Sequence, residues 1–429
     1  MKSLLSTLVI IAFAGNLAFS APQRSVGGPA APRFEPSKKA WSWAEKTLRK
    51  MSVDEKVGQL IHVGINARFA NQDSAYFKEI KRQVVDNKVG GIIFFVGPVY
   101  ETVHLANRMQ EAAKLPVLMS LDAETGVGMR FESAIVFPWA MALAATGDPG
   151  LARRMGVITG REARSSGFRH VFAPVLDVNN NSENPVINVR SFGEDPEDVA
   201  KFGLAFIDGL QSEGVLATAK HFPGHGDTDV DSHRGLPIID HSRERLDRLE
   251  LFPFRKAVDA GVASIMIAHI GLPQIDNEEI KPLQNYTIAY TEEGAEIVRP
   301  TGTIPATLSH KVQTDILRRD MGFKGLIVSD AMDMSGLTIY MTQAFEPVFR
   351  EAFQKKFPKI KVTTVVGRGF QLGQGFVDGQ HLPASSLIGG HRGTVPALPL
   401  DHGPATKPRS RQIFTWRHGG RRSEGICGV

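Results

Sequence analysis

The sequence has almost no cysteine, since Cys427 is the single one among 429 residues. An intramolecular disulfide is therefore impossible, and the fold must be stabilised by its apolar core. The length permits such a core, in one large or two medium domains. A hydrophobic content of 42% and a charged content of 22% are typical of a soluble globular protein.

Long apolar runs are also scarce. The run Leu4–Ala14 follows Lys2 and precedes the small-residue stretch Ala18-Phe-Ser-Ala21. This pattern predicts a secretory signal peptide, residues 1–20, cleaved near Ser20. A membrane anchor needs roughly 20 apolar residues, more than this run supplies. No other segment is long enough, so we expect no integral membrane span in the mature protein. We expect an exported protein, periplasmic or extracellular.

Acidic residues are scarce in the C-terminal tail, which has 13 Lys and Arg but only 5 Asp and Glu, whereas the rest of the chain is nearly balanced. Residues 341–429 carry a net charge of +8 and the remainder −3, against +5 for the whole chain. A basic tail could bind nucleic acid or an anionic surface. This tail lacks the interleaved aromatic residues of a nucleic-acid platform. We therefore predict a solvated or disordered tail and no nucleic-acid partner.

Short apolar runs alternate with helical patterns after a Pro-rich linker, residues 21–36. Such runs are typical of parallel strands that are buried on both faces. Seven βα units in series predict an α/β fold, a (β/α)₈ TIM-type barrel. No Gly-x-Gly-x-x-Gly follows the first run, which argues against dinucleotide binding. The runs are Gln59–Ile65, Val89–Val96, Val117–Asp122, His170–Val178, Val215–His221, Ser264–Ile270 and Leu326–Asp330.

Helix start signals stand between the runs. Asp148-Pro149 and Asp195-Pro196 each place an N-cap before proline at the first helical position. Ser242 opens a charged helix that ends near Ala260-Gly261. These signals predict the helices that cover the sheet.

The sequence does not assign the eighth βα unit. Residues 346–357 are compatible with a helix and residues 361–366 with a strand that closes the barrel. From Gly367 onward, glycine and proline are dense and periodicity vanishes. We assign residues 37–343 to the barrel and residues 344–429 to an atypical basic Gly/Pro-rich tail.

Polar residues stand where the predicted strands end. Active sites of barrel enzymes are assembled from loops at the carboxyl ends of the strands. Five different strands ending in this way predict a single site at that end of the barrel. The residues are Asp122, Asp177, Lys220-His221, His269 and Asp330.

The segment Lys220-His-Phe-Pro-Gly-His-Gly-Asp-Thr-Asp-Val-Asp-Ser-His233 crowds titratable residues into a loop. Its residue types allow three interpretations. The loop could be purely structural. In a catalytic loop, Asp231 would orient His233 and raise its basicity. A metal site could use imidazole and carboxylate ligands from His221, His225, Asp227 and His233.

This segment resembles the signature loop of bacterial β-N-acetylhexosaminidases of glycoside hydrolase family 3. Four further segments are similar to the family's other motifs, and together the likeness covers roughly residues 41–340. The expected motif of an eighth strand is absent from about Phe345, as a truncation, frameshift or fusion could produce. The four segments are Asp122-Ala-Glu-Thr-Gly-Val-Gly-Met-Arg-Phe131, Asn184-Pro-Val-Ile-Asn-Val-Arg-Ser-Phe-Gly-Glu-Asp-Pro196, Ile304-Pro-Ala-Thr-Leu-Ser309 and Ile327-Val-Ser-Asp-Ala-Met-Asp-Met334.

The resemblance implies a retaining β-N-acetylhexosaminidase. Asp330 corresponds to the nucleophile that forms a covalent glycosyl-enzyme. His233, oriented by Asp231, corresponds to the acid/base and replaces the usual second carboxylate. A base that is neutral when deprotonated repels an anion less, which leaves transfer to phosphate open as a side activity. The implied substrate is a terminal non-reducing β-linked N-acetylglucosamine of a cell-wall fragment, muropeptide or chitin-type oligosaccharide.

The resemblance also assigns the residues that bind the sugar. Charged groups give strong, directional hydrogen bonds to hydroxyl and acetamido groups. Neither a metal nor an organic cofactor is implied. Two other functions stay open, hydrolysis of another β-glycoside such as a glucoside, and carbohydrate binding without catalysis. The implied sugar-binding residues are Asp122, Arg130, Arg190, Lys220 and His221.

Overall fold

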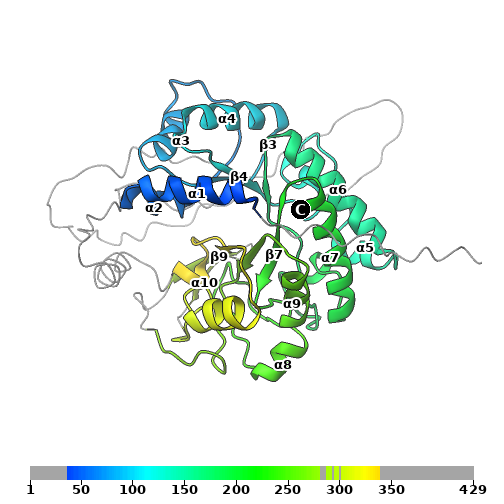
Figure 1. The fold of residues 1–429 in the computed structure, drawn as a ribbon. Helices are drawn as coiled ribbons and strands as arrows, with labels where there is room; N and C mark the ends of the chain where they lie inside the picture. Colours follow the sequence, from blue (N-terminus) through cyan, green and yellow to red (C-terminus); the bar gives the residue numbers. More distant parts are fainter. Residues whose placement is uncertain (1–35, 281–286, 292–293, 299–300, 339–429) are drawn as a thin grey trace, which may run out of the picture. The chain divides into compact units, whose positions relative to one another are not determined.

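The computed structural model describes residues 36–280, 287–291, 294–298 and 301–338 (Figure 1). All of them fall within the first of two structural units, residues 1–374. The predicted signal peptide, nearly all of the linker, the candidate eighth unit and the basic tail lie outside the described residues. Export therefore stays a prediction.

Seven parallel strands form one sheet in the described residues, and their spatial order follows the chain. Each strand pairs in parallel with the next. Each also falls within one of the seven predicted apolar runs or overlaps it, which confirms the α/β class. The strands are β1 (His62–Ile65), β2 (Gly91–Phe94), β4 (Leu118–Leu121), β6 (His170–Val171), β7 (Leu216–Phe222), β8 (Ser264–Ile267) and β11 (Leu326–Ser329).

Helices separate successive strands and surround the sheet (Figure 1). The two predicted Asp-Pro starts are correct: Asp148 accepts a hydrogen bond from the Gly150 amide at 2.8 Å, and Asp195 caps the next long helix from Pro196. The helices are α1 (Lys38–Lys50), α2 (Val53–Gln59), α3 (Ala75–Val85), α4 (Val99–Ala112), α5 (Ala140–Ala144), α6 (Pro149–Ser165), α7 (Pro196–Ser212), α8 (Arg243–Arg248), α9 (Leu251–Asp259) and α10 (Ser335–Thr338).

The single helix predicted from Ser242 is wrong in one respect, because it is two helices, α8 and α9. Ser242 caps α8 as expected. Leu249 then leaves the helical conformation, with φ −120° and ψ −76°. Pro253 has no amide hydrogen to donate to the Leu249 carbonyl, which explains the interruption. The predicted glycine stop is correct, since Gly261 follows α9 with φ +82°.

The strand expected over His170–Val178 is regular only in β6. Pro174 has no amide hydrogen for the ladder. The segment nevertheless continues beside β7, because the Leu176 amide donates to the Lys220 carbonyl at 2.6 Å. This pairing brings Asp177, the next residue, beside the end of β7.

Smaller elements complete the described chain, and the sequence did not predict them. One pair of short strands is parallel and the other is antiparallel. The elements are β3 (Gly97–Pro98) with β5 (Phe131–Glu132), β9 (Thr287–Thr291) with β10 (Gly294–Val298), the 3₁₀ turns η1 (Val127–Met129) and η2 (Asn188–Arg190), and the π-helical segment η3 (Lys311–Asp320).

The core lies on the inner strands and under the helices. Phe168 contacts Phe94 and Phe131, with ring centroids 5.1 Å apart in both pairs. Every residue of β8 is buried, whereas every residue of β1 and β11 is at least partly exposed. Within the described ranges, these two strands pair on one side only. The sheet is thus most firmly packed at its centre.

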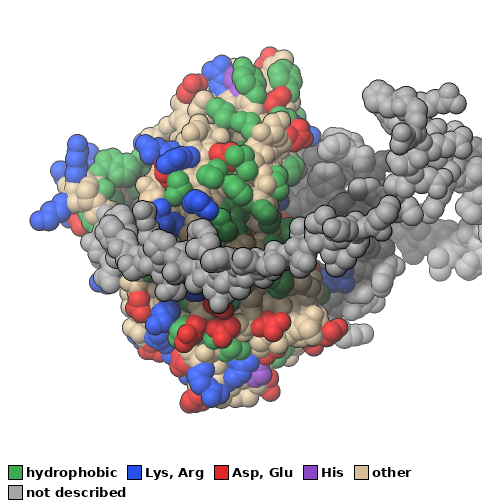
Figure 2. Space-filling model, turned by 90° about the vertical axis from the view of Figure 1, so that its right-hand side faces the viewer, with side chains coloured by type: hydrophobic (Ala, Val, Ile, Leu, Met, Phe, Trp, Pro, Cys, Tyr) green, Lys and Arg blue, Asp and Glu red, His purple; other side chains and the backbone are tan. Residues whose placement is uncertain are grey.

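The surface keeps many apolar side chains. On the face seen in Figure 2, hydrophobic side chains gather mainly in the upper half, and a row of acidic side chains crosses the lower half.

Among the helices that the structure describes, none combines the length and apolar character needed to cross a bilayer.

Candidate active site

The predicted strand-end residues meet at one edge of the sheet. Asp122 follows β4, Lys220 and His221 end β7, His269 follows β8, and Asp330 follows β11. Parallel strands present their carboxyl ends at the same edge. Residues up to 208 positions apart in the sequence therefore share one site.

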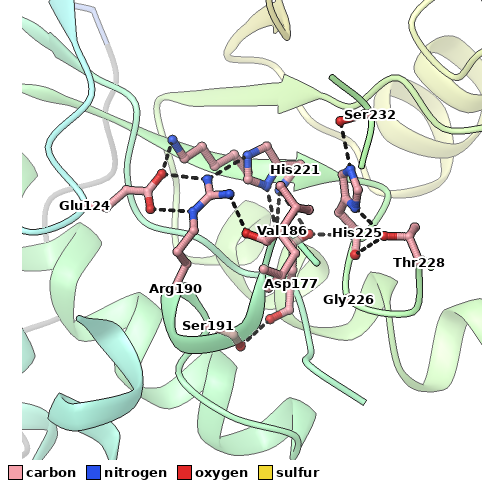
Figure 3. Close-up of polar contacts among 12 residues, drawn as sticks. Glu124, Asp177, Val186, Arg190, Ser191, His221, His225, Gly226, Thr228 and Ser232 are labelled. Carbon is pink, nitrogen blue, oxygen red and sulfur yellow. Dashed lines mark hydrogen bonds and ion pairs between the residues drawn. The ribbon is translucent and has the colours of Figure 1, made fainter. Parts of the chain in front are cut away.

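Five charged side chains form a connected group, which we call the charged cluster (Asp122, Glu124, Arg130, Arg190 and Lys220). The Lys220 ammonium lies 3.0 Å from Asp122 Oδ1 and 2.6 Å from Glu124 Oε1. Arg190 donates two hydrogen bonds to Glu124, at 2.9 and 2.8 Å (Figure 3). Arg130 donates to Asp122 Oδ2 at 2.5 Å. Four of the five predicted sugar-binding residues thus lie in one network.

Opposite charges keep the charged cluster ionised. Burial alone raises the pKa of Asp122 and Glu124, but the nearby cations outweigh it and hold both pKa values below their usual range. Burial likewise lowers the pKa of Lys220, and the two carboxylates more than compensate, so its pKa is raised. The cluster therefore presents fixed charges at neutral pH.

Glu124 is a site residue that the sequence analysis missed. Its side chain is only 5% exposed, and it bridges Lys220 and Arg190. A signal was available, because Glu124 lies two residues after Asp122 in the segment Asp122–Phe131, which resembles one of the family's motifs. Its partners lie 66 and 96 positions away, so their contact could not be read from the chain.

His221 is held between Asp177 and Arg190. Its Nδ1 lies 2.7 Å from Asp177 Oδ2, and its Nε2 lies 3.4 Å from Arg190 Nη2 (Figure 3). Because a guanidinium can only donate, Nε2 accepts and Nδ1–H donates to the carboxylate. Asp177, completely buried, also accepts from the His221 backbone amide at 3.1 Å. The imidazole is therefore fixed in one orientation.

The loop after β7 is packed closely against the segment that follows β6. A Cβ on Gly226 would lie 1.7 Å from the Val178 carbonyl oxygen, so only glycine fits there. Two further side chains of this loop have partners away from the charged cluster. His225 Nδ1 lies 2.7 Å from Thr228 Oγ1, and Asp227 Oδ2 lies 2.7 Å from His241 Nε2. Within the ranges that the structure describes, no three metal-ligating side chains are grouped around a common point.

Asp231 and His233 form a hydrogen-bonded pair. The Asp231 Oδ1 atom lies 2.7 Å from His233 Nδ1 and 2.9 Å from the His233 backbone amide. This hydrogen bond raises the pKa of His233, and the charge of Asp330 raises it further. His233 is 64% exposed, so its Nε2 can meet a ligand. The carboxylate fixes the imidazole, as the catalytic interpretation of the loop predicts.

Asp330 lies near several groups that favour its ionised form. Burial raises its pKa, but His221, His269, the Ala331 amide and Lys220 outweigh burial and hold the pKa below its usual value. Oδ1 accepts from the Ala331 amide at 2.8 Å. The carboxylate is therefore ionised at neutral pH.

His269 supports the loop that carries Asp330. Its Nε2 lies 2.8 Å from the Ala331 carbonyl oxygen and its Nδ1 lies 2.9 Å from Thr307 Oγ1. A carbonyl oxygen can only accept, so Nε2 carries the proton. His269 thus acts on the backbone beside Asp330, a role that its strand-end position alone did not specify.

Several known proteins are similar to this chain. The model of the glycosyl hydrolase family 3 N terminal domain matches residues 52–354. Beta-hexosaminidase A of Pseudoalteromonas piscicida is 38% identical over 285 residues, 63% of this chain and 44% of that protein. The beta-N-acetylglucosaminidase/beta-glucosidase of Cellulomonas fimi is 32% identical over 69% of this chain and 49% of its own length.

A solved structure has the same architecture. The family 3 beta-N-acetylglucosaminidase from Paenibacillus sp. superposes with a TM-score of 0.57 at 37% identity, over 67% of this chain and 51% of its own. The chain thus spans about half the length of these three relatives. The match over more than half of this chain is nonetheless decisive: the chain belongs to glycosyl hydrolase family 3.

Proposed function

We propose that the chain is a retaining glycosidase that releases terminal β-linked N-acetylglucosamine from oligosaccharides. The observation that carries the proposal is the Asp231–His233 hydrogen bond at 2.7 Å, in the loop after β7, at the same edge of the sheet as Asp330. The Asp330 charge raises the pKa of His233, so the two side chains lie in one electrostatic neighbourhood. A carboxylate and a proton donor on one sugar are what glycoside cleavage requires.

The carboxylate of Asp330 is suited to attack the anomeric carbon. It is ionised, and in the described part of the chain its one hydrogen bond is Oδ1 to the Ala331 amide. Oδ2 is therefore available to the substrate. As the bond from Oδ2 to the anomeric carbon forms, the glycosidic C–O bond breaks and a glycosyl ester of Asp330 results.

His233 is suited to move the proton in both steps. Its Nε2–H donates to the departing glycosidic oxygen in the first step. In the second step, water attacks the anomeric carbon, its proton passes to Nε2, and the ester bond to Asp330 breaks. The Asp231 carboxylate stabilises the imidazolium before the first step and after the second.

The charged cluster and His221 are suited to bind the sugar. The charges of the cluster are fixed and the His221 imidazole is held in one orientation, so hydrogen bonds to hydroxyl and acetamido groups cost little reorganisation. The relatives' names include beta-hexosaminidase and beta-N-acetylglucosaminidase, which supports N-acetylglucosamine as the terminal sugar. One relative's name also includes beta-glucosidase, so glucose is the competing sugar to test.

Two chromogenic substrates and one anomer measurement test the proposal. We expect 4-nitrophenyl N-acetyl-β-glucosaminide to be cleaved and the corresponding β-glucoside to be a much poorer substrate. Proton NMR during the reaction should detect the β-anomer of the free sugar first, because two displacements retain configuration. Preference for the glucoside would reassign the sugar. Sugar binding without turnover of either substrate would support a binding protein instead.

Replacing Asp231 with asparagine should shift the pH profile. The carboxylate raises the pKa of His233, so its removal should lower that pKa. With N,N′-diacetylchitobiose, whose leaving sugar alcohol must be protonated, the alkaline limb of kcat/KM should then move to lower pH, because His233 loses its proton earlier. At pH 7 we expect kcat/KM to fall by roughly 10²-fold. Asp229→Asn, at an exposed position of the same loop, is the matched control. An unmoved alkaline limb in D231N would contradict the assignment.

A further inference from the structure

Ser232 lies between the two members of the Asp231–His233 pair but points the other way. It is 2% exposed, whereas the His233 side chain is 64% exposed. Its Oγ lies 3.0 Å from His225 Nε2 (Figure 3). The residue between the two proposed catalytic side chains is thus attached to the interior of the protein.

The His225 imidazole, to which Ser232 is hydrogen-bonded, is itself held in one orientation. His225 is 1% exposed, and its Nδ1 lies 2.7 Å from Thr228 Oγ1. Its backbone amide donates to Asp177 Oδ1 at 2.7 Å. Burial lowers the pKa of His225 to about 4. A neutral imidazole donates through one nitrogen and accepts through the other, so His225 can form one hydrogen bond with the Thr228 hydroxyl and one with the Ser232 hydroxyl.

The backbone of Ser232 is held from its other side. The Gly336 amide in α10 donates to the Ser232 carbonyl at 3.0 Å. A Cβ on Gly336 would lie 2.7 Å from the Gly235 carbonyl oxygen and 3.0 Å from that of Ser232. Both neighbours are backbone atoms, so a larger residue would push the loop away. Gly336 lies six residues after Asp330.

We propose that His225, Ser232 and Gly336, together the loop anchor, set the position of His233 relative to Asp330. They are positioning residues, because none of them needs to touch the substrate. This inference rests on the proposed function and deepens it. The loop anchor connects the loop after β7 to the segment after β11, so the proton donor and the nucleophile are held as a unit.

Leaving groups of different basicity separate positioning from folding. Nitrophenolate departs without protonation, whereas the sugar alcohol released from N,N′-diacetylchitobiose needs a proton from His233. The ratio of kcat/KM for the two substrates does not depend on how much enzyme is folded. We expect Ser232→Ala and Gly336→Ala each to lower the chitobiose-to-nitrophenyl ratio about tenfold. His233→Ala should lower it further.

Two controls match the variants. Ser264→Ala removes another buried serine hydroxyl, one without a hydrogen-bond partner in the described residues. Ser335→Ala changes the neighbouring residue of α10, which, unlike Gly336, donates no backbone hydrogen bond to the loop in the described part of the chain. Both should keep the wild-type ratio.

Azide supplies an independent readout. It has no proton to lose, so its attack on the anomeric carbon of the glycosyl-Asp330 ester displaces the carboxylate without a base. The product is the β-glycosyl azide. With the nitrophenyl substrate, azide should raise kcat of S232A, G336A and H233A and leave the wild type and both controls nearly unchanged.

The outcomes distinguish the two proposals. If H233A shows the altered ratio and azide rescue but S232A and G336A match the wild type in both, the loop anchor is wrong and the proposed function stands. If H233A itself matches the wild type, the acid/base assignment fails. A lowered ratio and azide rescue in both S232A and G336A support the loop anchor.

Discussion

Replacing Asp330 with asparagine is expected to lower kcat by about 10⁴-fold or more while sugar binding persists. An amide oxygen is a poor nucleophile at the anomeric carbon, although the side chain has nearly the same shape. The amide oxygen can still accept the hydrogen bond from the Ala331 backbone that Asp330 Oδ1 accepts. The loss should therefore be chemical and not structural.

Three measurements check this expectation. Initial rates with the nitrophenyl substrate give kcat, calorimetry with N-acetylglucosamine gives binding, and circular dichroism checks the fold. Asp333→Asn, at an exposed position three residues later, is the matched control and should keep most of the activity. A slowly released fluorinated glycoside should also label the peptide that contains Asp330. Retention of more than a few per cent of wild-type kcat in D330N would exclude Asp330 as the nucleophile.

Replacing Glu124 with glutamine should have the largest effect on stability. The carboxylate is 5% exposed and compensates the charges of Lys220 and Arg190. Removing one partner of a buried ion pair leaves an uncompensated charge, which costs about 3–5 kcal/mol. We expect this loss in the free energy of unfolding from urea titrations near pH 7. KM should rise more than kcat falls, since two sugar-binding side chains lose their support.

An exposed pair provides the control for Glu124. Glu79 forms an ion pair with Arg82 at 2.7 Å on the surface of α3. Such pairs contribute about 0–1 kcal/mol, so Glu79→Gln should change stability little. Adding Lys220→Met to Glu124→Gln should cost less than the sum of the single changes, because one of the two charges that Glu124 compensated is then gone. Equal losses for E124Q and E79Q would show that the charged cluster does not stabilise the fold.

The strands were predictable because burial on both faces imposes a plain pattern. β2, β4 and β8 are short and mostly apolar runs, and their residues carry no competing signal. The strand ends were predictable for the same reason, since the first polar residue after each run marks the edge of the sheet. Asp122 and Asp330 were found in this way.

Contacts between distant segments were not predictable. The bridge from Glu124 to Arg190 and Lys220 depends on three separate segments meeting, and no single segment records it. The role of Ser232 depends on the direction of its side chain, which points to His225. A loop has no periodicity from which that direction could be predicted. The break between α8 and α9 was visible in Pro253, but the charge pattern favoured one continuous helix. Local signals therefore predicted the elements, and tertiary packing decided the support of the site.

The position of Asp330 has a consequence for how activity responds to warming. β11, which ends just before Asp330, pairs only with β8 within the described ranges, and all its residues are at least partly exposed. A strand whose residues are all partly exposed opens locally at a lower free energy than the fully buried β8. On warming, we therefore expect activity to be lost while most of the sheet is still folded. Brief cooling should restore turnover without complete unfolding and refolding.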